Sequence, residues 1–277
     1  MILQEIRNSI VNNLNISEEQ LVIRGLWPVD CLFKPNRNER TFNYKFIVAQ
    51  TIGQGAAYSM EHNYKMEYLE SLMGKNYLDL ELKSNDTALE IAILDAIYST
   101  LQDKPDQKVE LNGTSVAKAE ERANVIAEEA IRLIDRSTSK SELPLICNIG
   151  VVGNIIKELI DKDVQVIGTD FDDELVGKKL FGEVEIVHGN YNPDIIKKSD
   201  VAVITGMTLT TGTLDEIIDV AKRYNTKIVM FAETGSNLGS FYVKNGIDCV
   251  VGEPFPFYIF QGKTTLNIFR KKQNPRS

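Results

Sequence analysis

From about residue 143 onward, short runs of apolar residues alternate with helical stretches, and this rhythm limits the possible folds more than any other feature of the sequence. Short buried strands that alternate with helices form a mostly parallel sheet that helices cover on both faces. The second part of the chain is therefore predicted to be an α/β, Rossmann-like domain. The expected strands are residues 145–149, 164–169, 201–204, 227–231 and 249–251, and a hairpin of residues 258–261 and 264–268 is expected to add an antiparallel edge.

The first part of the chain has a different pattern. Apolar spacing predicts an amphipathic helix in residues 2–13 and a further helix in residues 86–101, and an alternating pattern predicts a strand in residues 41–50. These elements indicate a smaller α+β domain. Residues 103–113 are polar and include Pro105 and Gly113, which is typical of a linker. The expected domains are therefore residues 1–112 and 113–277.

The bulk composition excludes several classes of protein. The 277 residues are 43% hydrophobic and carry a net charge of −8, so binding to nucleic acid or to an anionic membrane is not expected. The sequence contains no run of about 18 apolar residues that could span a membrane and no signal-peptide pattern at its start. Three widely spaced cysteines imply no disulfide framework. We expect a cytoplasmic protein with a small-molecule ligand; a homodimer is left open.

A turn rich in threonine and glycine follows the expected strand 201–204. Such a turn lies at the carboxyl end of its strand, where open α/β sheets bind ligands. Backbone N–H groups and threonine hydroxyls there can hold a carboxylate or a phosphate. The alternative is an ordinary connection in which Thr213 caps the next helix, but capping needs one threonine and this turn has several. The candidate ligand-binding residues are Thr205, Gly206, Thr208, Thr211, Gly212 and Thr213.

Two further residues are candidates for proton transfer. Glu233 follows the expected strand 227–231 in a turn that also holds Ser236, a candidate ligand-binding residue, and it could act as a general base or orient an amine. The alternative is a surface carboxylate that caps a helix. His188 is the one histidine of the second domain and is therefore the second candidate. The alternative interpretation is that His188 is an exposed loop residue without a functional role. The other histidine of the chain is His62. Cysteine and histidine spacings do not indicate a preformed zinc site.

A glycine turn follows the first strand of the second domain. Gly150 and Gly153 precede a helix, and Asp170 ends the next strand, 170 − 150 = 20 residues after Gly150. Nucleotide-binding folds use this plan, in which glycines allow close approach of the ligand and the acid accepts hydrogen bonds from ribose hydroxyls. The three-glycine pattern of dinucleotide-binding sites is incomplete. S-adenosylmethionine carries no pyrophosphate and needs fewer glycines, so it fits this turn better. A turn that serves packing alone is the alternative.

The sequence resembles a known family. Residues 204–216 read Ile-Thr-Gly-Met-Thr-Leu-Thr-Thr-Gly-Thr-Leu-Asp-Glu, which is similar to a signature of the putative heavy-metal chelation family. Gly53 to Ala57 and Asn85 to Ala96 are similar to that family's glycine loop and small-residue helix. Thr211 stands where the family usually has asparagine. The resemblance implies an enolase-N-terminal-like domain followed by a Rossmann-like domain, with a site in the cleft between them.

The resemblance also implies a role in heavy-metal chelation, metal homeostasis or metallophore biosynthesis. We expect the chain to bind or process a small anionic metal-chelating molecule. This molecule would itself supply part of the coordination of a divalent metal ion. The threonine turn would hold the anionic group, and Gly53 and Gly55 would supply the facing wall. One alternative is an enzyme that uses S-adenosylmethionine or a nicotinamide cofactor on the Gly150 turn. Another is a non-catalytic ligand-binding or sensor protein.

Overall fold

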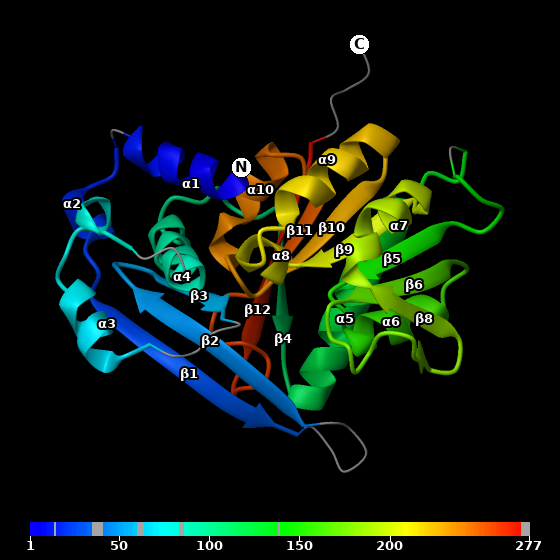
Figure 1. Ribbon diagram of the computed structural model, residues 1–277, viewed down its shortest axis with the longest axis horizontal. Coiled ribbons are helices and arrows are strands. Elements are labelled where there is room, and N and C mark those ends of the chain that lie inside the picture. Colours follow the sequence, from blue (N-terminus) through cyan, green and yellow to red (C-terminus); the bar gives the residue numbers. More distant parts are fainter. Residues whose placement is uncertain (14, 35–40, 60–63, 83–85, 138, 273–277) are drawn as a thin grey trace.

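The computed structural model describes residues 1–13, 15–34, 41–59, 64–82, 86–137 and 139–272. His62 and Asn85, both singled out above, lie outside these ranges. The chain forms two sheets, one of three strands and one of nine, with helices packed on both (Figure 1). Within the described ranges, no helix is long and apolar enough to cross a membrane.

The smaller unit is built on an antiparallel sheet in the order β1-β2-β3. A central helix, α4 (Thr87–Tyr98), packs on this sheet, and nearly all of its side chains are buried, since most of them are apolar. This arrangement confirms the predicted small α+β unit. Its other elements are β1 (Gly25–Phe33), β2 (Phe42–Gln50), β3 (Gln54–Tyr58), α1 (Ile2–Val11), α2 (Glu18–Leu21), the 3-10 helix Tyr77–Asp79 and α3 (Met66–Leu72).

The larger sheet has the order β4-β12-β11-β10-β9-β5-β6-β8-β7. The chain runs from β5 outward through β6 to β8, then crosses to the other side of β5 and continues through β9, β10 and β11; all these pairs are parallel. The predicted Rossmann-like fold is therefore confirmed. The central strands are β5 (Leu145–Ile149), β6 (Gln165–Asp170), β8 (Val184–His188), β9 (Val201–Thr205), β10 (Lys227–Ala232) and β11 (Cys249–Gly252).

Helices cover both faces of this sheet. Alternate residues of each strand point to opposite faces. Val203 and Val229 join the core under α5 and α6, while Ile204 and Met230 join the core that includes α9 and α4 of the smaller unit. The two units therefore share one continuous apolar core. The helices are α5 (Ser115–Arg132), α6 (Gly153–Ile160), α7 (Asn192–Lys198), α8 (Met207–Thr210), α9 (Leu214–Tyr224) and α10 (Gly239–Lys244), with the 3-10 helices Gly189–Tyr191 and Ser236–Leu238.

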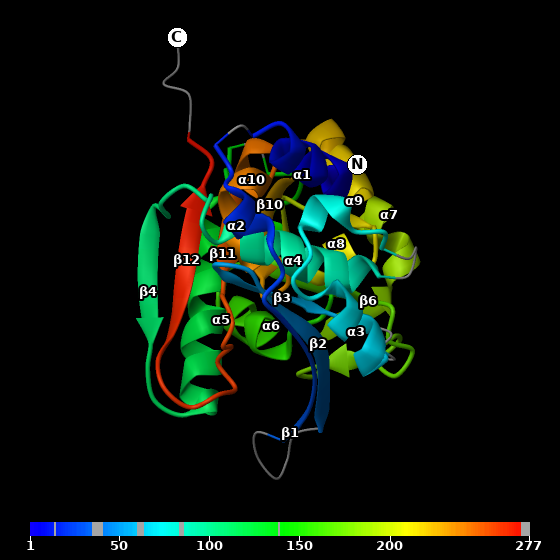
Figure 2. The same ribbon diagram turned by 90° about the vertical axis from the view of Figure 1, so that its left-hand side faces the viewer.

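Two expectations about the sheet's margins are corrected. The hairpin is wrong in its first half, because residues 258–261 form turns and the Tyr258 side chain is buried in a cluster with Phe46 of the small sheet. Its second half is β12 (Thr264–Arg270), which is antiparallel as expected but not at the edge. The segment expected to be a linker contains β4 (Gln107–Leu111), which pairs with β12 (Figure 2). The opposite edge strand is β7 (Lys179–Leu180). The domain boundary at residue 112 stays a prediction.

Gly55 illustrates how tightly the small sheet packs on α4. A Cβ atom on Gly55 would lie 2.2 Å from the backbone nitrogen of Ala96 and 2.5 Å from the carbonyl oxygen of Ala92. Because backbone atoms of a packed helix cannot move aside cheaply, we expect Gly55→Ala to lower the free energy of unfolding by about 1–3 kcal/mol. Urea denaturation measures this. Gly153→Ala, where a Cβ meets no atom within 4 Å, is the control, and equal losses for both variants would contradict the packing described.

Candidate functional site

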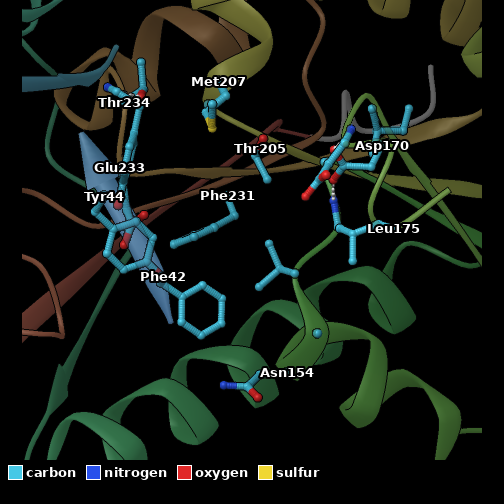
Figure 3. A pocket seen from close by; sticks show the side chains of 18 of the residues that line it. Phe42, Tyr44, Asn154, Asp170, Leu175, Thr205, Met207, Phe231, Glu233 and Thr234 are labelled. Carbon is cyan, nitrogen blue, oxygen red and sulfur yellow. Dashed lines mark hydrogen bonds between the residues drawn. The ribbon is translucent and has the colours of Figure 1, made fainter. Parts of the chain in front are cut away.

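A cavity of about 940 Å³ lies where the carboxyl ends of β5, β6, β9 and β10 face the small sheet (Figure 3). This position is the switch point of the sheet, where the chain reverses its direction of strand addition and where open α/β sheets bind ligands. The volume is within the range of small-molecule sites. The small sheet contributes an aromatic wall of Phe33, Phe42, Tyr44 and Tyr58, and the large sheet contributes the ends of its strands.

One side of the pocket is an ionic cluster around Arg122 of α5. Its Nη1 donates to Oε1 of Glu233 at 2.9 Å and to Oε2 of Glu253 at 2.9 Å. The guanidinium lies 3.9 Å from the ring centroid of Tyr258 and 4.6 Å from that of Phe231, so aromatic faces enclose the cation. Arg122 is 5% exposed and Glu253 is fully buried, while Glu233 keeps 12% exposure at the pocket wall.

The cluster holds two carboxyl groups against one cation. The pKa of Glu233 is raised from 4.5 to about 7, chiefly by burial and also by the charge of Glu253, and Arg122 and a hydrogen bond from Tyr58 offset this rise only in part. Burial lowers the pKa of Arg122, but the two carboxylates outweigh this effect and raise it overall. Glu233 can therefore gain or lose a proton near neutral pH while Arg122 stays charged, which is the property of a general acid or base.

Tyr44, Tyr58 and Tyr258 line the pocket together with Glu233, and Figure 3 shows Tyr44 beside Glu233. The hydroxyl oxygens of Tyr44 and Tyr258 are 3.2 Å apart. Burial, together with nearby negative charge, raises the pKa of Tyr44 and of Tyr58 well above the ordinary value. These hydroxyls consequently remain protonated at neutral pH and can donate hydrogen bonds to a ligand or to Glu233.

The other side of the pocket is the turn after β5. Gly150 adopts a φ of +74°, a conformation that favours glycine. The next two backbone N–H groups are already satisfied: Val151 donates to Oδ2 of Asp170 at 2.7 Å, and Val152 donates to Oδ1 of Asn148 at 2.9 Å. Figure 3 shows Asp170 on the side of the pocket away from Glu233. The turn is therefore closed by the protein's own side chains.

The threonine turn follows β9 and lies between these two sides. The Thr208 hydroxyl donates to the carbonyl oxygen of Thr205 at 2.8 Å, and the Thr211 hydroxyl donates to the carbonyl oxygen of Thr208 at 3.4 Å. The hydroxyls of Thr211 and Thr213 are also 3.0 Å apart and bond to each other. Because the Thr208 proton points to the backbone, this side chain offers lone pairs to the pocket and favours a ligand that donates hydrogen bonds.

The structure brings most of the predicted site residues together, although their roles stay predictions. Nine of them line the pocket, drawn from four strand ends far apart in the sequence. They are Gly150, Gly153, Asp170, Thr205, Gly206, Thr208, Thr211, Thr213 and Glu233.

The remaining five predicted residues lie outside the lining of this pocket. Gly53 and Gly55 approach α4, so their lack of a side chain serves packing. Gly212 has a φ of +73° and connects α8 to α9. Ser236 is buried behind the turn. His188 accepts a hydrogen bond at Nδ1 from the Asn190 amide.

Several residues of the pocket and of the buried ionic cluster beside it were not predicted from the sequence. Arg122 could have been predicted to have a buried acidic partner, because it lies between Ala119 and Ala123 on the packing face of a helix, where a charged residue needs one. Tyr44 lies on a strand whose alternation was recognised, but nothing in that pattern shows which distant residues it faces. Glu253 follows β11 as Glu233 follows β10, and this parallel could have identified it.

Metal ligands are not clustered in the described ranges: no group of three or more His, Cys, Asp or Glu side chains there could hold an ion. Cys147 and Cys249 are buried and far from solvent, and burial raises the pKa of the Cys147 thiol to about 11. A metal at this site would therefore need ligand atoms from a bound molecule.

The raised pKa of Glu233 predicts a pH dependence of stability. A carboxyl whose pKa is higher in the folded than in the unfolded state stabilises the fold fully below its unfolded value, here 4.5, and loses this contribution as the pH rises to about 7. We expect Glu233→Gln to show a smaller loss of stability across that window than the wild type. Urea denaturation at pH 5 and pH 7.5 measures it, and identical slopes would contradict the assignment.

The fold and the site together define a two-unit α/β protein with a ligand pocket at the switch point of a Rossmann-like sheet. Residues 139–252 match the DUF364 family, whose description is "Putative heavy-metal chelation". The resemblance to the heavy-metal chelation family predicted from the sequence is thereby confirmed. No curated protein matches the chain.

Two solved structures of DUF364 proteins with unknown function align with nearly the whole chain. One, from Pyrococcus horikoshii, is 14% identical, covers 98% of this chain and 100% of its own, and has a TM-score of 0.54. The other, from Desulfitobacterium hafniense DCB-2, is 13% identical, covers 96% of this chain and 98% of its own, and has a TM-score of 0.56. At these identities the likeness shows a shared fold.

Proposed function

We propose that the chain binds a small metal-chelating organic molecule in this pocket and that Glu233 exchanges a proton with it. The observation that carries the proposal is a carboxyl group with a pKa of about 7 in the wall of a 940 Å³ pocket. Perturbed carboxyl groups in such pockets are typical of sites that transfer protons. The family description, heavy-metal chelation, supports the link to metals.

The chemistry of chelation explains why a proton acceptor is useful here. An amine binds a metal through its nitrogen lone pair, so an ammonium group must first lose a proton. Glu233 can accept that proton, and the aromatic faces of Phe42 and Tyr44 favour the positive charge before it is lost. The lone pairs of Thr208 accept hydrogen bonds from the same kind of group. A chelator with amine and carboxylate groups therefore fits this side of the pocket.

The anionic groups of such a molecule can also use partners that were not predicted from the sequence. The Thr208 hydroxyl donates to the carbonyl oxygen of Thr205, so it is a poor donor to a carboxylate. Lys45 and Lys157 also line the pocket and can pair with carboxylates. Most of the negative charge is expected to be neutralised by the metal that the molecule itself holds, since the described ranges supply no ligand cluster.

Thermal unfolding tests this proposal with Zn²⁺ alone, nitrilotriacetate alone and their complex. At about 100 times its dissociation constant, a ligand stabilises a fold by about 2.7 kcal/mol, which is roughly 5–10 °C for a chain of this size. We expect the complex to raise the Tm of the wild type and to lose its effect in Glu233→Gln. Glu110→Gln, at an exposed carboxylate, is the matched control. An equal shift with Zn²⁺ alone, or an undiminished shift in Glu233→Gln, would overturn the proposal.

A second candidate is an enzyme that binds S-adenosylmethionine or a nicotinamide cofactor on the Gly150 turn. The strand order favours it, because β5 is central and Asp170 ends the neighbouring strand β6, as in nucleotide-binding sheets. Stabilisation by either cofactor, with product formation from a bound substrate, is the result expected. Stabilisation without turnover of any bound compound would instead favour a non-catalytic binding or sensor protein.

A further inference from the structure

Asp170 accepts a hydrogen bond from the turn whose counterpart binds the phosphates in dinucleotide-binding sheets. There, the N–H groups of the glycine turn after the first strand point at the pyrophosphate. Here the corresponding amide of Val151 donates to Asp170 at 2.7 Å, and the amide of Val152 donates to Asn148 at 2.9 Å. A phosphate would find these donors taken and would meet the fixed negative charge of Asp170. The turn therefore disfavours a pyrophosphate.

The same carboxylate remains able to accept hydrogen bonds from a neutral ligand. Oδ2 accepts from Val151, and Oδ1 accepts from the amide of Asp172 at 3.0 Å. Each carboxylate oxygen has two lone pairs, so both retain acceptor capacity. Asp170 lines the pocket, and these two backbone bonds fix its orientation. Such a fixed carboxylate binds a pair of adjacent hydroxyls well, because each of its two oxygens can accept a hydrogen bond from one of them.

Beside Asp170 the pocket wall is apolar and unusually exposed. Phe171 is 48% exposed and Phe181 is 56% exposed, and both line the pocket with Leu175. The Phe171 ring is held against His188, with ring centroids 5.5 Å apart. Exposed aromatic side chains in a pocket stabilise a bound flat ring by stacking on it, as aromatic side chains do with the bases of nucleic acids.

We infer that this side of the pocket is a subsite for a nucleoside without phosphate groups. The ribose hydroxyls donate to Asp170 and the base lies over Phe171 and Phe181. The inference rests on the second candidate function and narrows it, since it favours a phosphate-free nucleoside cofactor over a dinucleotide. The subsite lies in the same cavity as Glu233 but on its opposite side, so a nucleoside and a chelating molecule can occupy the cavity together.

Isothermal titration of the wild type with adenosine, 2′,3′-dideoxyadenosine and NAD⁺ tests the subsite. We expect adenosine to bind, dideoxyadenosine to bind at least tenfold more weakly because it lacks both hydroxyls, and NAD⁺ to give no binding. Equal affinities for adenosine and dideoxyadenosine, binding of NAD⁺ as tight as that of adenosine, or no binding of adenosine at millimolar concentration would each overturn the inference. This comparison needs no variant, so it does not depend on whether a variant folds.

A substitution gives a second measurement. Asp170→Asn keeps the shape of the side chain and removes its charge, and we expect it to weaken adenosine binding at least tenfold. Asp173→Asn, at an exposed position in the same segment, is the matched control. Unchanged binding in a folded Asp170→Asn protein would overturn the inference. A thermal shift with the Zn²⁺–nitrilotriacetate complex but no adenosine binding overturns the subsite alone, and the reverse result overturns the proposed function alone.

Discussion

Arg122→Met is expected to lower the free energy of unfolding by about 3–5 kcal/mol, because it leaves two buried carboxyl groups without their shared cation. Methionine preserves much of the apolar stem of arginine, so the loss reports the missing charge more than a missing volume. Urea denaturation at pH 7.5 measures it. The loss should become smaller as the pH falls below about 7, since Glu233 then takes up a proton and no longer repels the carboxylate of Glu253.

Arg136→Met provides the control for this effect. Arg136 pairs with Asp163 at 3.2 Å, but both side chains are largely exposed, at 61% and 71%. Exposed ion pairs contribute about 0–1 kcal/mol. A loss below about 1 kcal/mol for Arg122→Met, similar to that of Arg136→Met, would contradict the view that a desolvated ionic cluster is held by one guanidinium.

Asp95→Ala is expected to be nearly as harmful, with a loss of about 2–5 kcal/mol, because two buried amides would lose their acceptor. Asp95 lies on α4 and accepts from the amide of Ala56 on β3 at 2.9 Å and from the amide of Asn237 at 2.7 Å. It thus connects the small sheet to the turn that follows Glu233. Urea denaturation measures the loss, and a loss below about 1 kcal/mol would show that this connection contributes little.

Asp95 also predicts a pH dependence that Asp95→Asn should reduce. Burial raises its pKa from 3.8 to about 7, although the hydrogen bonds from Ala56 and Asn237 act in the opposite direction. Between about pH 3.8 and pH 7, the Asp95 carboxyl group therefore keeps a proton in the folded protein that it has released in the unfolded chain. The corresponding stability is complete below about pH 3.8 and disappears as the pH rises to about 7. Asp95→Asn should flatten this part of the stability curve, and an unaltered curve would contradict the direction of the shift.

The sequence identified the strand ends at the site for a physical reason. Parallel strands that are buried on both faces appear as short apolar runs, and their carboxyl ends meet at one edge of the sheet. The register confirms this for two candidate turns, since Thr205 pairs with Phe231, two residues before Glu233. Local pattern and sheet topology together were therefore enough to place Gly150, Asp170, Thr205 and Glu233 in one region.

The facing wall and the direction of the hydroxyls could not be predicted in the same way. Tyr44 reaches the pocket from a strand far away in the sequence, and alternation shows which residues share a face but not what that face meets. The number of threonines in the turn favoured an anion site, yet the donor or acceptor role of Thr208 depends on where its proton points. Gly53 and Gly55 resembled a ligand loop, but their small size serves the approach of α4.

The central claim, that the pocket holds a small chelating molecule, is tested most directly by identifying what the purified protein retains. Glu233→Gln removes the proton-exchanging carboxyl group from the pocket wall, so this variant should no longer retain the molecule. Mass spectrometry of the compounds and metals released by heat from both proteins makes the comparison. We predict a compound with amine and carboxylate groups in the wild type that is absent from Glu233→Gln. Equal amounts in both proteins, or metal retained without any organic molecule, would contradict the account.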